Sequence, residues 1–585
     1  MKYPTLSEQE ASRQMIDAFR GYNHNLRIGD GEFFDMKNLT SDAYPVLSPR
    51  KKRGVYASPD SPQGLIPKDS LCYVDGTDFV IDQYHVNMGL STDPEKCPKR
   101  LISMGAYVII MPDKKYINTL KLTDFGNIDA SFQTYSDVTF TLCDVNGEIY
   151  TNAPASPDEP ENPKNMELWI DKSTTPHTLK QYSSASAMWV TVPSTYIRIE
   201  STGIGEAFQA YDGVTISGVL DQNLQELNTS TVIWARGDNY IVVTGILDDK
   251  ITQAYADGAI TVERKMPEMD FVIESENRLW GCKYGTAGNG EIVNEIYASK
   301  LGDFRNWNCF MGLSTDSYAA SCGTDGPFTG AITHLGYPLF FKENCVHKVY
   351  GNYPANFQIQ TTACRGVQKG CGNSLAIVNE TLYYKSGSGV CAYDGSLPAE
   401  VSAALGDTVY SGAVAGAHGN KYYISMQDTE GVYHLFVYDT TKGMWHREDN
   451  LHADAFCACR GDLYCIDHDS KQIITMLGSG TQDTGKVEWM AESGEIGLSY
   501  PDMKYISRLL FRMSMEVGAE VRFYARYDSA GEWKLLGTVT GQNLRTFLLP
   551  IRPMRCDHMR LRIVGKGDVK IYSVTKTIVQ GSDIS

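Results

Sequence analysis

The feature that most constrains this fold is a repeat of about forty residues in the second half of the chain. Short apolar strands open with similar residues at positions 279, 339, 382, 422 and 463, so the successive spacings are 60, 43, 40 and 41 residues. A turn rich in Gly, Asp or Asn and then a second strand follow each of these positions. A period near forty that is built from strands alone is typical of a β-propeller blade. The sequence therefore predicts an all-β propeller, with six or seven blades once the earlier hairpins are included.

Those earlier hairpins lie between residues 70 and 125. Leu71–Val74 and Phe79–Ile81 flank an Asp-Gly turn, and a second pair of strands at 107–111 and 116–120 flanks Pro112-Asp113. Both patterns favour antiparallel hairpins. We expect them to supply the first blade or blades and to close the ring with the last strands of the propeller.

The repeat is lost between about 130 and 265 and again after 480, which divides the chain into four regions. Residues 1–130 hold an N-terminal segment and the first blades, 131–265 an inserted β-domain, 266–480 the remaining blades, and 481–585 a C-terminal β-sandwich. The sandwich is predicted because apolar and polar residues alternate around Phe523 and Leu561, as they do in half-buried antiparallel strands.

One helix is predicted, over residues 7–20. Its start carries a capping-box pattern, Met15, Ile16 and Phe19 would form one apolar face, and Gly21 would end it. This helix would precede the first strand of the fold.

Charge and cysteine content narrow the functional classes. The net charge of −17 argues against a protein that reads nucleic-acid sequence, because such proteins offset phosphate charge with a basic face. It is compatible with an acidic channel wall along which DNA slides, and equally with plain solubility. The 14 cysteines are scattered without a Cys-x-x-Cys pair, which favours free thiols in a reducing compartment.

No targeting or membrane segment is expected. Polar residues follow the first five residues, which does not resemble a signal peptide, and no run of about eighteen apolar residues occurs. We expect a protein that is made in a cytoplasm and leaves it, if at all, by lysis.

Two segments resemble a known family. Residues 26–54 contain Gly31-Glu32, then Lys37-Asn38-Leu39, and close on Pro49-Arg50 with basic residues and a glycine. This resembles the opening of phage tail-tube nozzle proteins, also called tail tubular protein B, of short-tailed phages. Residues 294–307, which run from a strand through Ser299 and Gly302-Asp303 to Asn306-Trp307, resemble a blade segment of the same family.

The resemblance implies a structural protein of the virion tail and not an enzyme. The chain would form a ring with copies of itself, commonly six, on the tail axis below the portal and adaptor. It would contact these and other tail proteins, and DNA would pass through the ring without being held. The protein would be made in the host cytoplasm and end in the virion.

The basic strip Arg50, Lys51, Lys52 and Arg53 is the one candidate interface. It could pair with an acidic surface on a neighbouring subunit or an adjacent ring, or it could be a solvated loop. Both interpretations stay open at the level of sequence.

No catalytic motif is present, so we name no catalytic residue, no cofactor and no metal ligand. Cys457, Cys459, Cys465 and His468 lie close enough in sequence to suggest zinc, but their spacing is not that of a zinc finger, and core packing is favoured. Asp467 and Asp469 around His468 are read as ordinary turn residues.

A second class of function stays open beside the structural one. Propellers with C-terminal sandwiches are common in proteins that bind or hydrolyse glycans, and the 35 tyrosines offer surfaces on which sugars stack. The alternative is therefore a glycan-binding or glycan-hydrolysing propeller, which could also face a receptor.

Overall fold

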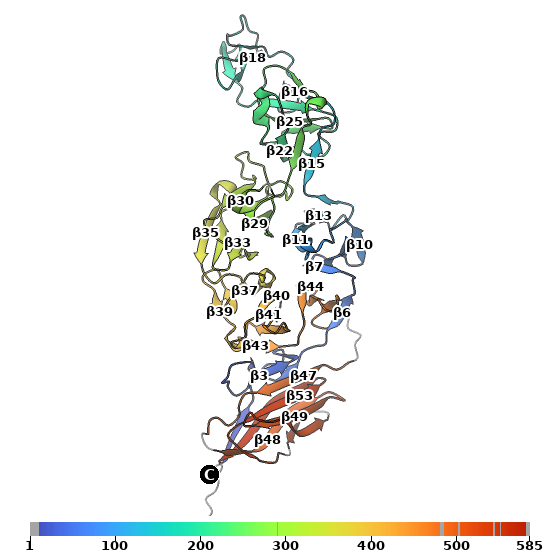
Figure 1. Cartoon of the computed structure of the whole chain (residues 1–585), viewed down its shortest axis with the longest axis vertical. Coiled ribbons are helices and arrows are strands. Elements are labelled where there is room, and N and C mark those ends of the chain that lie inside the picture. Colours follow the sequence, from blue (N-terminus) through green and yellow to red (C-terminus); the bar gives the residue numbers. More distant parts are fainter. Residues whose placement is uncertain are drawn as a thin grey trace, which may run out of the picture.

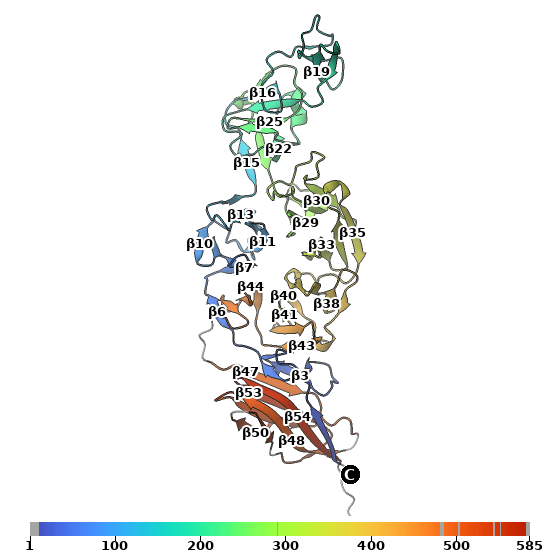
Figure 2. The same cartoon turned by 180° about the vertical axis from the view of Figure 1, so that it is seen from behind.

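The computed structural model describes residues 11–288, 290–479, 485–500, 503–541, 544–549 and 551–580. The described chain consists almost entirely of strands with a few short 3-10 turns, which confirms the all-β class. Three parts follow one another along the long axis of the molecule: the inserted domain, the propeller and the C-terminal sandwich (Figures 1 and 2). Among the described residues, no helix has the length and apolar character needed to cross a membrane.

Seven groups of four antiparallel strands formed by the described residues surround the centre of the propeller; six are separate sheets, and the seventh, β40–β43, is part of a larger sheet (Figure 1). The first two are β7 (Pro62–Pro67), β8 (Leu71–Asp75), β9 (Asp78–Ile81), β10 (Tyr84–Asn87) and β11 (Arg100–Met104), β12 (Tyr107–Met111), β13 (Lys115–Asn118), β14 (Phe125–Asn127). The third and fourth are β28 (Phe271–Ser275), β29 (Arg278–Thr286), β30 (Ile292–Ala298), β31 (Tyr318–Ser321) and β32 (Gly330–His334), β33 (Tyr337–Lys342), β34 (Cys345–Tyr350), β35 (Gln358–Ala363).

The last three sheets complete the circle. They are β36 (Ala376–Val378), β37 (Thr381–Lys385), β38 (Val390–Tyr393), β39 (Ala399–Glu400); then β40 (Ser411–His418), β41 (Lys421–Gln427), β42 (Tyr433–Asp439), β43 (Met444–Arg447); and finally β44 (Ala453–Cys459), β45 (Asp462–Asp467), β46 (Ile473–Thr475), β6 (Gly54–Ala57). Contacts between the innermost strands run from β7 through β11, β28 and β32, across the 3-10 turn η5 (Gly372–Ser374), and through β36, β40 and β44 back to β7. The ring is therefore closed.

The forty-residue repeat marks the second strand of five blades. Leu279, Leu339, Leu382, Tyr422 and Leu463 lie in β29, β33, β37, β41 and β45, and all five are fully buried. The period was readable because each blade buries the same position of the same strand against its neighbours. The expected closure by early and late strands is also present, since β6 pairs antiparallel with β46.

The C-terminal sandwich is built from both ends of the chain. One sheet contains β1 (Ala11–Ile16), β54 (Val569–Gln580), β48 (Lys504–Met515), β51 (Arg545–Leu548) and β52 (Arg555–Cys556). The other contains β2 (Gly21–Tyr22), β3 (Glu32–Lys37), β47 (Glu488–Ser493), β53 (Met559–Lys566), β49 (Glu520–Tyr527) and β50 (Lys534–Thr540). The two faces meet in an apolar core, where the rings of Phe511 and Phe523 lie 4.5 Å apart.

The predicted N-terminal helix is wrong where the structure describes it. Residues 11–16 form strand β1, which pairs antiparallel with β54 from Ala11↔Val579 to Ile16↔Val574, while residues 7–10 lie outside the described part. The capping and spacing signals are local, and a neighbouring strand that offers backbone hydrogen bonds along its whole edge outweighs them.

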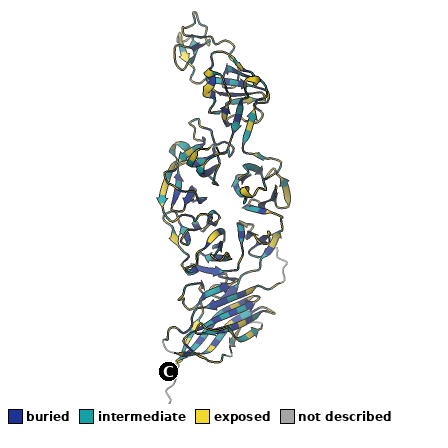
Figure 3. Ribbon diagram, in the orientation of Figure 1, coloured by how far each residue is buried: buried dark blue, intermediate teal, exposed yellow. Residues whose placement is uncertain are grey.

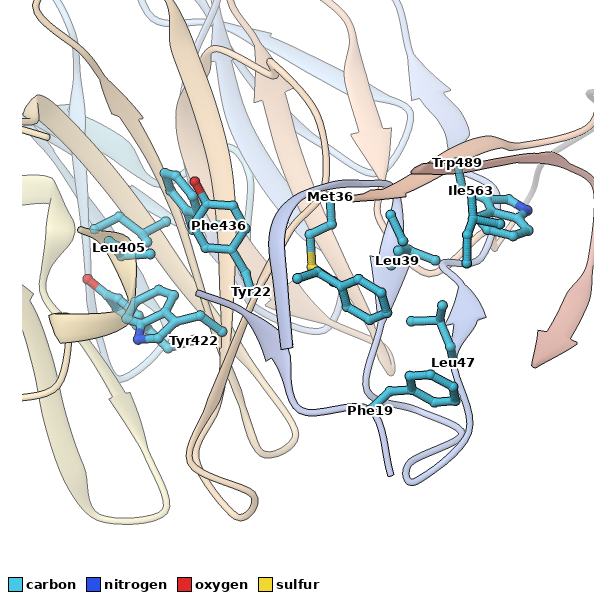
Figure 4. Packing of buried hydrophobic residues seen from close by; sticks show 14 of the residues in the cluster. Phe19, Tyr22, Met36, Leu39, Leu47, Leu405, Tyr422, Phe436, Trp489 and Ile563 are labelled. Carbon is cyan, nitrogen blue, oxygen red and sulfur yellow. The ribbon is translucent and has the colours of Figure 1, made fainter. Parts of the chain in front are cut away.

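A single sheet joins the propeller to the sandwich. β43 of the sixth blade pairs with β2, so that β40–β43 continue through β2 and β3 into the sandwich as ten consecutive strands. Buried side chains follow the same path, from Tyr422 and Phe436 in the blade past Tyr22 and Met36 to Trp489 (Figure 4). The propeller and sandwich therefore share one core.

The inserted domain leaves the ring between β14 and β28 and carries three sheets. They are β15 (Ala130–Gln133), β27 (Thr261–Arg264), β22 (Gly213–Ser217), β23 (Ser230–Val232); β24 (Ala235–Gly237), β25 (Tyr240–Thr244), β21 (Tyr196–Glu200), β16 (Val138–Cys143), β26 (Ile251–Gln253); and β17 (Ala155–Ser156), β18 (Leu168–Asp171), β19 (Thr178–Ser183), β20 (Met188–Thr191). The first two sheets enclose an apolar core of their own that includes Phe140 and Ile241. Buried residues run through the middle of the sheets in all three parts, as Figure 3 shows.

The remaining short elements are two strands and five 3-10 turns. They are β4 (Leu39–Thr40), β5 (Ser48–Pro49), η1 (Pro94–Lys96), η2 (Gln222–Leu227), η3 (Tyr255–Asp257), η4 (Pro354–Asn356) and η6 (Ala403–Leu405).

Candidate functional site

The innermost strands of the blades surround a cavity of about 640 Å³ at the centre of the propeller. Seven elements contribute to its wall: β7, β11, β28, β32, η5, β40 and β44. The wall is about half polar, and a few polar residues contribute to it. Those polar residues are Gln63, Lys99, Arg100, Asn373, Asp454 and His468.

Small residues keep this cavity open. Ala331, Ala415 and Ala455 occupy lining positions on three different inner strands. A side chain at Gly372 would place its Cβ 2.8 Å from the Thr329 carbonyl oxygen, closer than such atoms approach in proteins. The neighbouring blades thus meet backbone to backbone around the cavity, and the absence of bulk at these positions leaves room at the centre.

Two neighbouring cationic side chains, Lys99 just before β11 and Arg100 at its start, have different environments. The Lys99 ammonium is buried in an ion pair with Asp113, with 2.5 Å between Nζ and Oδ2, so its charge is neutralised within the protein. The Arg100 guanidinium lies 4.3 Å from the centre of the Phe271 ring, and burial lowers its pKa. Arg100 is therefore the cation that this wall offers to a polar ligand.

A compact group of three side chains lies on the wall of the last blade. His468 Nδ1 lies 2.9 Å and 3.1 Å from the two carboxylate oxygens of Asp454, and the ring of His468 stacks on that of His452 at 4.0 Å. Nitrogen or oxygen atoms of all three residues fall within 4.8 Å of one another. This arrangement can hold a cation or move a proton, since imidazole and carboxylate do both.

The cavity contains a single carboxylate among the described lining residues, Asp454. Most glycoside hydrolases cleave with two carboxylates, about 5–10 Å apart, one of which protonates the leaving group. The wall of this cavity offers binding groups for a polar ligand but not that pair.

The two arginines of the basic strip form ion pairs within the chain. Arg53 contacts Glu448 at 2.9 Å and Asp449 at 2.8 Å, and Arg50 contacts the same two carboxylates at 3.5 Å and 3.3 Å. Burial acts to lower the pKa of Arg53, but Asp449 and Glu448 outweigh it and raise that pKa. Both arginines thus fasten the N-terminal segment to the loop between β43 and β44.

Lys51 is exposed and Lys52 half-buried within the same strip. The prediction that the strip contacts another subunit stays a prediction, and Lys51 is its exposed residue. Sequence alone had no signal for the internal use of the arginines, because their acidic partners lie almost four hundred residues further along the chain.

The cysteines considered for zinc do not gather. Cys457 and Cys459 pack between the last blade and the first, and Cys465 faces a different apolar cluster toward the sixth blade. Burial raises the pKa of the Cys457 thiol to about 12 and also raises that of Cys465, so both remain protonated. His468 instead lies beside His452 and Asp454, a grouping that sequence reasoning missed. The signal was the pattern His-x-Asp with a further His just after the next strand of the hairpin.

No protein-family model and no curated protein matches this sequence. Solved structures with a similar strand arrangement include an exo-β-1,3-galactanase from Phanerochaete chrysosporium, with 8% identity, a TM-score of 0.23, and coverage of 52% of this chain and 94% of that one. An arabinoxylan arabinofuranohydrolase of glycoside hydrolase family 43 from Bacillus subtilis matches at 8% identity and a TM-score of 0.17, over 52% and 94%. An acylaminoacyl peptidase from Pyrococcus horikoshii matches at 11% identity and a TM-score of 0.22, over 59% and 55%.

This comparison corrects one expectation. The chain was expected not to be an enzyme, yet the propeller structures that it resembles are glycoside hydrolases and a peptidase, and the expectation is contradicted. The physical reason is that a propeller fixes a central cavity without fixing its chemistry, so the fold alone excludes no activity. At these TM-scores the likeness concerns the strand arrangement, and it carries no argument about substrate or reaction.

Proposed function

We propose that this chain is a structural subunit of a phage tail, of the nozzle kind, which assembles with copies of itself into a ring on the tail axis. In this role it contacts the portal, adaptor and other tail proteins, lines part of the DNA exit channel and resides in the virion. The resemblance of residues 26–54 and 294–307 motivates the proposal. The observation that supports it most is that each of these two segments lies at a junction between two parts of the molecule.

The first segment links the sandwich to the propeller. It begins beside β3, which pairs with β47 of the sandwich, and ends at β6, which closes the last blade. Between them Arg50 and Arg53 pair with Glu448 and Asp449. The segment thus forms strands in both parts, and its ion pairs fasten it to the propeller.

The second segment links the propeller to the inserted domain. Asn306, fully buried, accepts a hydrogen bond from the Gly213 backbone at 2.9 Å and donates one to Asp212 at 3.0 Å. Asp212 in turn pairs with the buried Arg264 at the end of the insert. Buried polar networks of this kind hold one relative orientation, because any displacement leaves polar groups without partners.

Both segments that carry the resemblance are thus the joints of an elongated, stiff molecule. Stiff joints suit a subunit that keeps its shape within a ring and meets partners at both ends. The net charge of −17 suits a channel that must not retain DNA, since like charges repel the phosphate backbone.

The test is immunogold labelling of purified phage particles by electron microscopy, with serum raised against the whole chain. The expected result is label on the tail axis. The control is the same serum after absorption with the purified protein, which should remove the label. Absence of the chain from particles, while it accumulates in infected cells, would overturn the proposal.

A glycan-handling propeller is the second candidate, favoured by the open cavity with Arg100, Asn373 and Asp454 on its wall. Polar side chains converging on a cavity of this size suit a hydroxyl-rich ligand. The test is a glycan-binding screen together with a hydrolysis assay on the glycans that bind. Arg100→Gln and Asn373→Ala should each weaken binding at least tenfold, whereas Lys121→Ala, an exposed change on the second blade, should not. Equal binding by all three variants would exclude this cavity as the glycan site.

A further inference from the structure

His452, Asp454 and His468 converge although nothing in their spacing along the chain requires it. Ala453 pairs with Asp467 in the β44–β45 hairpin, so the residues that flank this pair are brought together at one end of the blade. The His468 backbone N–H donates to the His452 carbonyl at 2.9 Å, which ties the two histidines at the backbone as well. The strand register shifts between Ala453 and Ala455, so Asp454 lies at a bulge of β44, and His452 and His468 lie just outside the two strands. The end of this hairpin therefore positions all three side chains.

The two imidazoles are held in place before any ligand arrives. The Tyr433 ring stacks on the outer face of His452 at 3.6 Å, and His468 stacks on its other face at 4.0 Å. Within the described part of the chain, the ring nitrogens of His452 make no hydrogen bond, whereas His468 is oriented by Asp454. Packing thus restricts the ring of His452 and leaves its nitrogens available.

The electrostatic surroundings suit a cation. The Asp454 carboxylate contacts the His468 ring and lies close to that of His452, so a negative charge sits beside both imidazoles. The carboxylates of Asp467 and Asp469 also lie near the His452 ring. A bound cation would be stabilised by all three.

We propose that His452, Asp454 and His468 form a binding site for a divalent transition-metal ion, with zinc as the best match, on the wall of the central cavity. Two imidazoles and one carboxylate are a ligand set that zinc uses when it keeps further positions open. Calcium and magnesium prefer ligand sets made entirely of oxygen, so they fit less well. No metal ligand was expected from the sequence, so this site departs from that expectation.

The site lies where a bound metal could contact a ligand in the cavity. Asp454 and His468 both line the cavity of about 640 Å³, so the open coordination positions face that space. A water molecule, or an oxygen atom of a ligand in the cavity, would complete the coordination. The inference does not depend on the proposed tail role, since it concerns binding by the isolated chain.

The test is titration of the full-length, chelator-treated protein with Zn²⁺ by calorimetry and with Co²⁺ by visible absorption. We expect one ion per chain and d–d bands of Co²⁺ that arise from nitrogen and oxygen ligands. His468→Ala and Asp454→Asn should each weaken binding at least a hundredfold. His85→Ala is the matched control, because His85 lies near Asp78 at 3.9 Å without a third ligand, and it should leave binding unchanged.

Three results would overturn the proposal. They are less than half an ion bound per chain, unchanged affinity in the two site variants, or an equal loss in the His85 control. Circular dichroism and the unfolding midpoint identify any variant that misfolds. Asp454→Asn preserves the shape of the side chain and removes only its charge, so it remains informative if His468→Ala loosens the turn.

Discussion

Tyr22, close to the start of the described chain, pairs through its backbone with Trp445 in the outermost strand of the sixth blade. Its ring lies 5.6 Å from that of Phe436 in the same blade, and burial raises its pKa well above the ordinary value. This pairing makes the N-terminal segment the fifth strand of a blade and the start of the sandwich sheet. The joint between propeller and sandwich is therefore hydrogen-bonded backbone and not a linker.

The close approach at this joint predicts that Gly21→Ala is costly. Gly21 has φ of +82°, and an added Cβ would lie 2.3 Å from the Trp445 carbonyl oxygen. Gly76→Ala is the matched control, since Gly76 has φ of +58° but nothing within 4 Å of its added Cβ. Chemical unfolding should show a loss of about 1–2 kcal/mol for Gly76→Ala from backbone strain alone. The loss for Gly21→Ala should be clearly larger, and equal losses would contradict the tight joint.

The ion-pair cluster behind the joint predicts unequal effects within the basic strip. Arg53→Met leaves Glu448 and Asp449 with Arg50 as the cation of the cluster, and removal of one partner from a mostly buried pair costs about 3–5 kcal/mol. Lys51→Met, at an exposed position two residues away, should change stability by less than about 0.5 kcal/mol. Urea unfolding of both variants checks this. A loss for Lys51→Met as large as for Arg53→Met would show that the strip acts as a whole.

The blade register predicts a core penalty at Leu382. Its side chain is fully buried in β37, so Leu382→Ala should cost about 2–5 kcal/mol. Leu397→Ala in the same blade removes an equal volume from a side chain that is 63% exposed, and it should cost little. Thermal or urea unfolding of the pair decides the matter. A near-zero loss at Leu382 would mean that the repeat is placed in the wrong register.

Stability is expected to fall in acid because of His446. Burial lowers the pKa of this imidazole to about 3, whereas in the unfolded chain it titrates near about 6.5. Between these values the unfolded state binds the additional proton, so stability is complete above about pH 6.5 and is lost as the pH falls toward 3. One such group contributes a slope of up to about 1.4 kcal/mol per pH unit within that window.

The measurement is the urea midpoint of the wild type and of His446→Gln at several values between pH 7 and pH 4. Burial also lowers the pKa of His347, to about 4, so the wild-type slope contains more than one histidine. The difference between the two proteins isolates His446: the variant should lose stability less steeply. Parallel pH profiles would show that His446 is not the group responsible.

Much of the fold could be predicted from sequence because propeller strands are specified locally. Each blade buries the second strand, and the alternation and turn residues that produce it lie within a few residues of Leu279, Leu382 or Leu463. The repeat stops near residues 130 and 480, but no local signal showed that β1, β2 and β3 from the other end of the chain join the C-terminal sandwich. The first helix failed because its local signals compete with a partner, β54, that lies at the other end of the chain.

The candidate site likewise combines residues that are close in the sequence with an arrangement that only the folded structure shows. The sequence contains all the residues of the β44–β45 hairpin, but it does not distinguish a histidine in a turn from a metal ligand, because that depends on which side chains lie next to it. Only the register that pairs Ala453 with Asp467 brings His452, Asp454 and His468 together. The sequence by itself determined the blade strands and their period, because these depend on neighbouring residues. The tertiary structure alone decided the pairing of Tyr22 with Trp445, the internal use of Arg50 and Arg53 and the three-residue cluster, because contacts between distant segments depend on how the whole ring closes.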